Sequence, residues 1–124
     1  MIEKVYTDKA PAAIGPYSQA MKYNGFLFTS GQIPVNPATG EIEGNEIEAQ
    51  ATRVCENLKV VLEEAGTDFT KVIKTTCFLS DMADFGKFNS VYEKYFVSKP
   101  ARSCVAVKQL PKNVLCEVEL IAEV

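Results

Sequence analysis

The sequence contains no histidine, which removes the side chain that most often serves as general base or metal ligand near neutral pH. Its cysteines never show the paired C-x-x-C spacing of a zinc site; they fall singly inside apolar patterns, as reduced core cysteines do. We therefore expect no metal site and no disulfide framework. Any acid–base chemistry must use carboxylates, lysine, tyrosine, cysteine or water. The four cysteines are Cys55, Cys77, Cys104 and Cys116.

Long apolar runs are also missing, and none approaches the length of a membrane-spanning helix. The segment from Met1 to Asp8 lacks the basic cluster and apolar run of a signal peptide. Positive charge is scarce, because 13 Lys and Arg against 16 Asp and Glu give a formal net charge of −3. Such a molecule repels a phosphate backbone. We expect a cytoplasmic protein that binds neither membranes nor nucleic acid.

The chain has 124 residues and a hydrophobic content of 47%, which is enough for one packed core and too little for two. No repeat, low-complexity tract or linker interrupts it. We therefore expect a single domain over residues 1–124.

The strongest local signal is the dipeptide Asn24-Gly25 between the strand-like segments 18–23 and 26–30. Asn-Gly at this spacing predicts a two-residue type I′ hairpin. Continuing the pairing back from the turn brings Tyr17 beside segment 30–32.

Two amphipathic helices are predicted. From Glu46, apolar residues recur at steps of three and four until Gly66, which is a typical helix stop. Asp81 is placed to cap a second helix, and Pro100 marks its far side. The inner face of this helix is predicted to carry Phe85, Phe88, Tyr92, Tyr95 and Phe96.

Further strands are predicted at 71–80, 102–108 and 116–122, with 102–108 in a central position. The order β-β-α-β-α-β-β describes an α+β fold, in which two helices cover one face of a mixed sheet. The strands at 71–80 and 116–122 carry apolar residues on both faces. Because two helices cover only one face, we expect the other to be buried against further subunits in a closed homo-oligomer.

Two segments near the hairpin are candidates for a site. The segment 14–20, I-G-P-Y-S-Q-A, is compatible with a rigid turn that feeds the hairpin, although a turn leaves Tyr17 less well explained. The segment 29–34, T-S-G-Q-I-P, ends a strand with Ser30 and Gly31. A glycine there fits either a β-bulge or the close approach of a ligand.

Two charged residues stand in the last predicted strands. Arg102 lies on the same side as the small residue Cys104, so it is either an extended surface side chain or a two-pronged binder of a carboxylate. Glu117 alternates with Glu119, as on a solvated edge, but it is also a candidate partner of Arg102. The strand register decides between these alternatives, and a slip of one residue would reverse the answer.

Six motifs in order resemble the reactive intermediate deaminase (RidA; YjgF/YER/UK-type) family, over nearly the whole chain. None is specific alone; their order and separations carry the resemblance. It implies a chorismate-mutase-like α+β fold, assembled as a homotrimer with clefts between adjacent subunits. The motifs are I-G-P-Y-S-Q-A at 14–20, T-S-G-Q-I-P at 29–34, F-N-S-V-Y at 88–92, P-A-R-S-C-V at 100–105, L-P-K at 110–112 and C-E-V-E at 116–119.

The resemblance also implies a 2-iminobutanoate/2-iminopropanoate deaminase that needs no cofactor. Its substrates would be the enamines and imines that pyridoxal-phosphate-dependent dehydratases release, and its products 2-oxo acids and ammonia. Arg102 matches the arginine that grips the substrate carboxylate, and Glu117 the carboxylate associated with the attacking water. The residues matched to the rest of the pocket are Tyr17, Ser30, Gly31, Asn89 and Cys104.

Two other functions stay open from the sequence. The same cleft in a trimer could hold 2-oxo acids or other small carboxylates for regulation, without turnover. Some members of the family are described as translation inhibitors or endoribonucleases, which would make RNA the partner. The acidic composition and the lack of a stripe of aromatic and basic residues count against RNA.

Overall fold

The hairpin at Asn24-Gly25 forms as predicted, in a computed structural model that describes all of residues 1–124. The two turn residues have φ angles of 53° and 85°, as a type I′ turn requires. They join strands β2 (Ala20–Tyr23) and β3 (Phe26–Thr29), in which Tyr23 pairs with Phe26. The predicted register is therefore confirmed.

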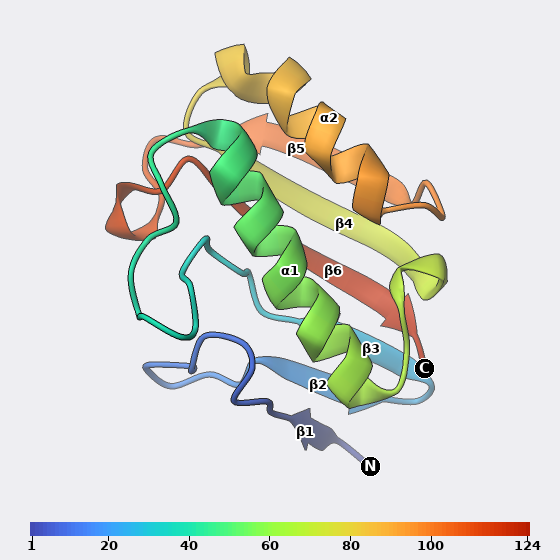
Figure 1. The fold of residues 1–124 in the computed structure, drawn as a ribbon. Helices are drawn as coiled ribbons and strands as arrows, with labels where there is room; N and C mark the ends of the chain where they lie inside the picture. Colours follow the sequence, from blue (N-terminus) through green and yellow to red (C-terminus); the bar gives the residue numbers. More distant parts are fainter.

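The sheet has six strands in the order β1-β2-β3-β6-β4-β5 (Figure 1). Only β4 and β5 run parallel, and the other neighbours are antiparallel, so the sheet is mixed as expected. The remaining strands are β1 (Glu3–Val5), β4 (Val72–Leu79), β5 (Ala101–Ala106) and β6 (Cys116–Glu123).

Two details of the predicted sheet are wrong. The strand β1 was not predicted, because three residues are too few to show an alternating pattern, and the element order therefore begins β-β-β. The strand β5 lies at the edge of the sheet and not at its centre. Its apolar composition suggested a central strand, but Val105 is 46% exposed, so one chain alone does not cover it.

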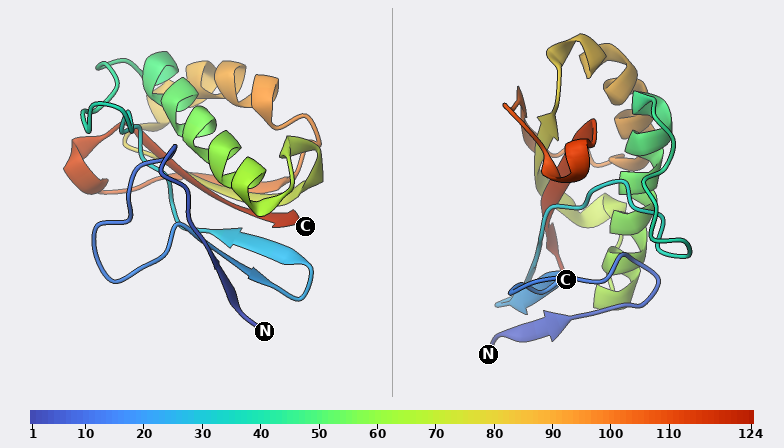
Figure 2. Two further views of the ribbon diagram at one scale, coloured as in Figure 1. Left: turned by 60° about the horizontal axis from the view of Figure 1, so that its bottom comes forward. Right: turned by 90° about the vertical axis from the view of Figure 1, so that its left-hand side faces the viewer.

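Both helices lie on the same side of the sheet, as predicted (Figures 1 and 2). Helix α1 (Ile47–Ala65) ends at Gly66, whose φ of 85° makes it a left-handed cap. Asp81 caps a short 3₁₀ turn that continues directly into helix α2 (Phe85–Tyr95), and the Ala83 N–H donates to its carboxylate at 2.8 Å. No helix combines the length and apolar character needed to cross a membrane.

The core fills the layer between the helices and the sheet. The predicted inner face of α2 is confirmed at Phe88 and Tyr92, and Phe96 just beyond the helix is also buried, whereas Phe85 and Tyr95 are only partly buried. Three cysteines are buried there as free thiols, and Cys104 is half-buried.

The opposite face of the sheet carries no helix (Figure 2). Residues paired across neighbouring strands point to the same side of the sheet. Phe28 pairs with Ile121, and Phe78 pairs with Val105, so these apolar residues share this open face. Tyr23, Phe26 and Phe28 are all exposed on this face. The expected second apolar face is therefore present, and a patch of this kind is typical of protein interfaces.

Candidate functional site

Arg102 lies under helix α2. In β5 it pairs with Thr75 of β4, and both side chains point toward the helices. The Arg102 Nη1 donates to Asn89 Oδ1 at 2.7 Å, and its Cζ lies 4.7 Å from the ring centroid of Tyr92 and 5.4 Å from that of Phe85. The three contacting residues of α2 are spaced four and three apart, so they form one stripe of the helix. The guanidinium is thus held against the protein, which an extended surface side chain would not be.

Arg102 forms no ion pair with a carboxylate of the chain. Its guanidinium borders a cavity of about 540 Å³, whose lining also includes Asn89, Tyr92, a second cation, Lys99, and one carboxylate, Glu93, which forms no ion pair with Arg102. An arginine that is oriented by its neighbours but not neutralised by them is suited to bind an anion.

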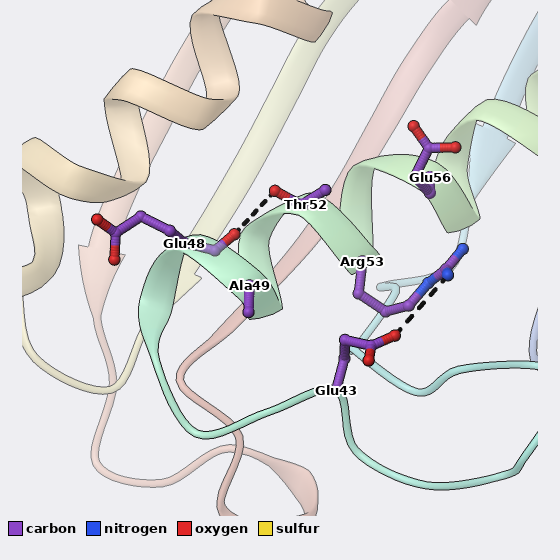
Figure 3. A pocket seen from close by; sticks show the side chains of 6 residues that line it. All are labelled: Glu43, Glu48, Ala49, Thr52, Arg53 and Glu56. Carbon is purple, nitrogen blue, oxygen red and sulfur yellow. Dashed lines mark hydrogen bonds and ion pairs between the residues drawn. The ribbon is translucent and has the colours of Figure 1, made fainter.

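The other arginine of the chain, Arg53, is already engaged (Figure 3). It lies 3.9 Å from a Glu43 carboxylate oxygen, and its Nε donates to Asn57 Oδ1 at 3.2 Å. The carboxylates of Glu48 and Glu56 line the same cavity of about 370 Å³. This surplus of negative charge makes the cavity on α1 unsuitable for a carboxylate ligand.

Glu117 and Gly31 are in contact on the open face of the sheet. Glu117 alternates with the buried Cys116 and Val118 of β6, so its side chain points away from the helices. A Cβ atom on Gly31 would overlap Glu117 Oε2 and lie 2.8 Å from its Cδ. Glycine is therefore required here for close approach. Burial, and then the nearby charge of Glu119, raise the pKa of the Glu117 carboxyl.

Gly31→Ala is expected to displace the Glu117 carboxylate while leaving the fold intact. The added methyl meets the end of a flexible side chain, which can move away, and the Gly31 φ needs no left-handed conformation. For any reaction that uses the Glu117 carboxylate we expect a rate lower by about 10²-fold, as a shift of a reacting group by about 1 Å causes, with little change in Tm. A variant that stays fully active would show that the position of this carboxylate does not matter.

Ser30 ties the end of β3 to the segment that carries Tyr17. Its Oγ donates to the Ser18 carbonyl at 2.6 Å, and its N–H donates to the Gln19 carbonyl at 2.9 Å. The two segments therefore lie side by side, as the hairpin register predicts. The ring of Tyr17 is 53% exposed and packs beside Gly15.

Three buried amide side chains hold the loops around these residues, and sequence reasoning missed them. Gln19 binds Thr7 and Pro11, Asn57 binds the carbonyls of Ile33 and Val35, and Gln50 binds Gly44 and Leu115. Each fixes a segment that adjoins Tyr17, Gly31 or Glu117. Two of them could have been found from the sequence, because Gln50 and Asn57 are polar residues on the apolar stripe of a helix. A buried polar side chain needs hydrogen-bond partners, so such a residue indicates a contact with another segment.

Cys104 lies on β5 beside Arg102 and pairs in register with Cys77. Burial raises the pKa of its thiol, and the charge of Arg102 offsets only part of this effect. A thiol held in its protonated form is a poor nucleophile. Cys104 is thus suited to line a pocket and not to attack a substrate.

The site residues predicted from the sequence form two groups within one chain. Arg102, Asn89 and Cys104 make up what we name the arginine half-site, on the helix side of β5. Glu117 and Gly31, with Ser30 nearby, make up the glutamate half-site on the open side of β6. Strand β4 lies between β5 and β6, so one chain does not bring Arg102 and Glu117 together.

Comparison with known proteins places this chain in a large group of relatives. The family described as Endoribonuclease L-PSP matches residues 7–124. A RutC family protein of Pyrococcus abyssi is 54% identical over 121 residues, which cover 97% of this chain and 95% of the relative.

Two solved structures show the same fold. The Rid family protein YyfA of Yersinia pestis, whose function its structure report gives as unknown, has a TM-score of 0.97 and 46% identity, and the match covers 100% of both chains. TdcF of E. coli, solved with bound serine, has a TM-score of 0.93 and 43% identity, and the match covers 98% of both chains. These matches span the fold and both half-sites, so the chain belongs to the Rid (YjgF/RutC/RidA) family.

Proposed function

We propose that this protein is a deaminase that hydrolyses 2-iminobutanoate, 2-iminopropanoate and their enamine tautomers in the cytoplasm. The observation that carries the proposal is Arg102, an oriented guanidinium that is half-buried, faces a cavity and lacks a carboxylate partner. A small 2-imino acid carries one carboxylate, which this fork of N–H groups fits. The serine bound to TdcF supports a ligand of this size and charge.

The reaction needs few catalytic groups. Protonation at carbon, by a proton from solvent, converts the enamine into the protonated imine, whose carbon is electrophilic. Glu117 accepts a proton from water as the water oxygen attacks that carbon, and it returns the proton to the nitrogen of the resulting carbinolamine. As the C–N bond breaks, the Glu117 carboxylate accepts the proton of the carbinolamine hydroxyl, which releases ammonia and the 2-oxo acid, and Glu117 then returns this proton to solvent. The raised pKa of Glu117 suits it to both proton transfers.

We infer that the active cleft forms between subunits of a homotrimer. Arg102 and Glu117 lie on opposite sides of the sheet in one chain, so a cleft that holds both must combine two chains. Apolar residues also adjoin Glu117 on the open face, since Phe78 pairs with it and the exposed Val105 pairs with Phe78, and they support burial of this face against a neighbour. A closed ring of three chains would pair each arginine half-site with the glutamate half-site of its neighbour.

Mixing two inactive variants tests this arrangement. Co-expressed Arg102→Ala and Glu117→Gln chains should regain activity, since about one quarter of all clefts would receive both intact residues when equal amounts of the two chains assemble at random. Each variant expressed alone should stay inactive. Activity that does not return, in oligomers shown by mass spectrometry to contain both chains, would place the site within one chain.

The activity itself is tested by adding the protein to a threonine or serine dehydratase reaction. We expect faster release of the 2-oxo acid and ammonia, with faster loss of the absorbance of the transient enamine and imine. A protein that binds 2-oxobutanoate and yet leaves this rate unchanged would be a carboxylate-binding regulator and not a deaminase.

An RNA-directed activity is the second candidate, because the matching family is described as an endoribonuclease. A net charge of −3 gives little attraction for a phosphate backbone. RNA binding whose affinity falls steeply with salt concentration would favour this candidate.

A further inference from the structure

Tyr92 lies between Arg102 and a buried hydroxyl group. Its ring faces the Arg102 guanidinium at 4.7 Å, and its own hydroxyl shares a hydrogen bond of 2.8 Å with Thr75 Oγ1. Thr75 is also the register partner of Arg102 on the neighbouring strand. Arg102, Thr75 and Tyr92 therefore contact one another in pairs, through strand pairing, a hydrogen bond and a cation–π contact.

The ring of Tyr92 has little freedom to move. It is 8% exposed and stacks on Phe96 with centroids 4.2 Å apart and planes inclined by 17°. Phe88 contacts it from a second side at 5.8 Å. Aromatic packing of this kind, together with the bond to Thr75, makes the ring a rigid surface.

Besides Tyr92, the Arg102 guanidinium contacts only Asn89 and the ring of Phe85, whose centroid lies farther away, at 5.4 Å, and which is only partly buried. A guanidinium has five N–H donors, and only Nη1 is bound to the protein, through Asn89. One hydrogen bond lets the planar group rotate about that bond. A ring face within about 6 Å supplies the missing constraint, because a cation is attracted to the face of the ring.

We propose that Tyr92 is a positioning residue that sets the plane of the Arg102 guanidinium, so that its free N–H groups meet the substrate carboxylate. The inference rests on the proposed function and adds to it the group that orders the anchor. Tyr92 lines the same cavity, but the role proposed here is exerted through Arg102. It acts by keeping Arg102 in its binding conformation before the ligand arrives, which reduces the entropy lost on binding.

The test compares three variants of the full-length protein. Tyr92→Leu removes the ring, Tyr92→Phe keeps the ring and removes the bond to Thr75, and Tyr95→Leu is the matched control. Tyr95 lies on the same helix and bonds Glu56 at 2.7 Å, without contact to Arg102. For each variant, kcat and KM for imine hydrolysis are measured, together with the Kd of 2-oxobutanoate and of its uncharged amide by calorimetry.

For Tyr92→Leu we expect the KM and the Kd of 2-oxobutanoate to rise about tenfold, which corresponds to about 1.4 kcal/mol of lost cation–π attraction and ordering. The Kd of the amide should change much less, because it lacks the charge that Arg102 recognises. Tyr92→Phe should retain binding within about threefold, since the ring face remains. Tyr95→Leu should bind as the wild type does.

Equal weakening of acid and amide, or weakening by Tyr95→Leu to the same extent, would overturn the proposal and indicate general damage to the core. If Tyr92→Leu does not fold, Tyr92→Met, which also removes the ring but fills more of its volume, gives a second measurement through the Nε–H exchange rate and 15Nε shift of Arg102. Values identical to wild type in this variant would also overturn the proposal. Because Kd is measured without turnover, a wild type that binds 2-oxobutanoate but hydrolyses no imine would contradict the deaminase proposal alone.

Discussion

Arg102→Ala is expected to abolish recognition of the substrate carboxylate, lowering kcat/KM for 2-iminobutanoate by about 10²- to 10³-fold, as the loss of a charge-assisted two-pronged contact does. The wild-type guanidinium is held by Asn89 and the Tyr92 ring and has no carboxylate partner in the chain, so its binding capacity is left for a ligand. Most of the loss should appear in KM. Steady-state kinetics with a dehydratase that generates the imine in situ measure it.

Two further variants test whether the loss reflects the planar guanidinium of Arg102 in particular. Arg102→Lys keeps the positive charge but not the planar fork, and it should recover only a small part of the affinity. Arg53→Ala removes the chain's other arginine, which is already paired with Glu43, and should leave kcat/KM near that of the wild type. If Arg102→Ala forms intact oligomers and hydrolyses imine at the normal rate, Arg102 is not the anchor.

Glu117→Gln is expected to lower kcat by about 10²- to 10⁴-fold with a small change in KM, because general base catalysis is lost while the carboxylate anchor remains. Glutamine keeps the size of the side chain next to Gly31, so the fold should be preserved. Single-turnover hydrolysis measures the chemical step. Loss of the oligomer without a specific loss of kcat would instead give Glu117 a structural role.

The pH dependence of the wild type provides an independent check. A general base works only when it is deprotonated, and burial together with Glu119 raises the pKa of Glu117. The rate should therefore fall as the pH falls through this raised pKa, at a higher pH than for an ordinary glutamate. Glu119→Gln removes one of the two causes and should shift this acidic limb toward lower pH. If the acidic limb does not move, the charge of Glu119 does not affect the pKa that controls the rate.

The same pKa shift predicts the effect of Glu117 on stability. A folded-state pKa above the unfolded value means that Glu117 favours the folded state at low pH and that this contribution is lost as the pH rises through the folded pKa. At neutral pH the half-buried negative charge of Glu117 lowers the stability of the folded state. Glu117→Gln should thus have a Tm at least as high as that of the wild type at neutral pH, which argues that its loss of activity is not a loss of folding.

The local elements follow from patterns within short stretches of the sequence. Asn24-Gly25 set a hairpin and its register, because both residues tolerate the positive φ of a type I′ turn. The stripe of apolar residues from Glu46 to Gly66 set α1, since a period of 3.6 residues has meaning within one helix. The sequence also contains six motifs in an order that identifies the family, and the family match covers residues 7–124. The hairpin and helix signals come from residues close together in the chain, and the family signal comes from the order of short motifs along it.

The tertiary structure alone decided where those elements meet. It placed β5 at the sheet edge, put Arg102 and Glu117 on opposite faces, and laid Asn89 and Tyr92 over the guanidinium. Strand neighbours and helix packing depend on contacts between distant segments, and a shift of one residue in register reverses the face of every side chain. For this reason the sequence left Arg102 either a surface residue or an anchor, whereas the packing of α2 over β5 shows its guanidinium held, unpaired, beside a cavity.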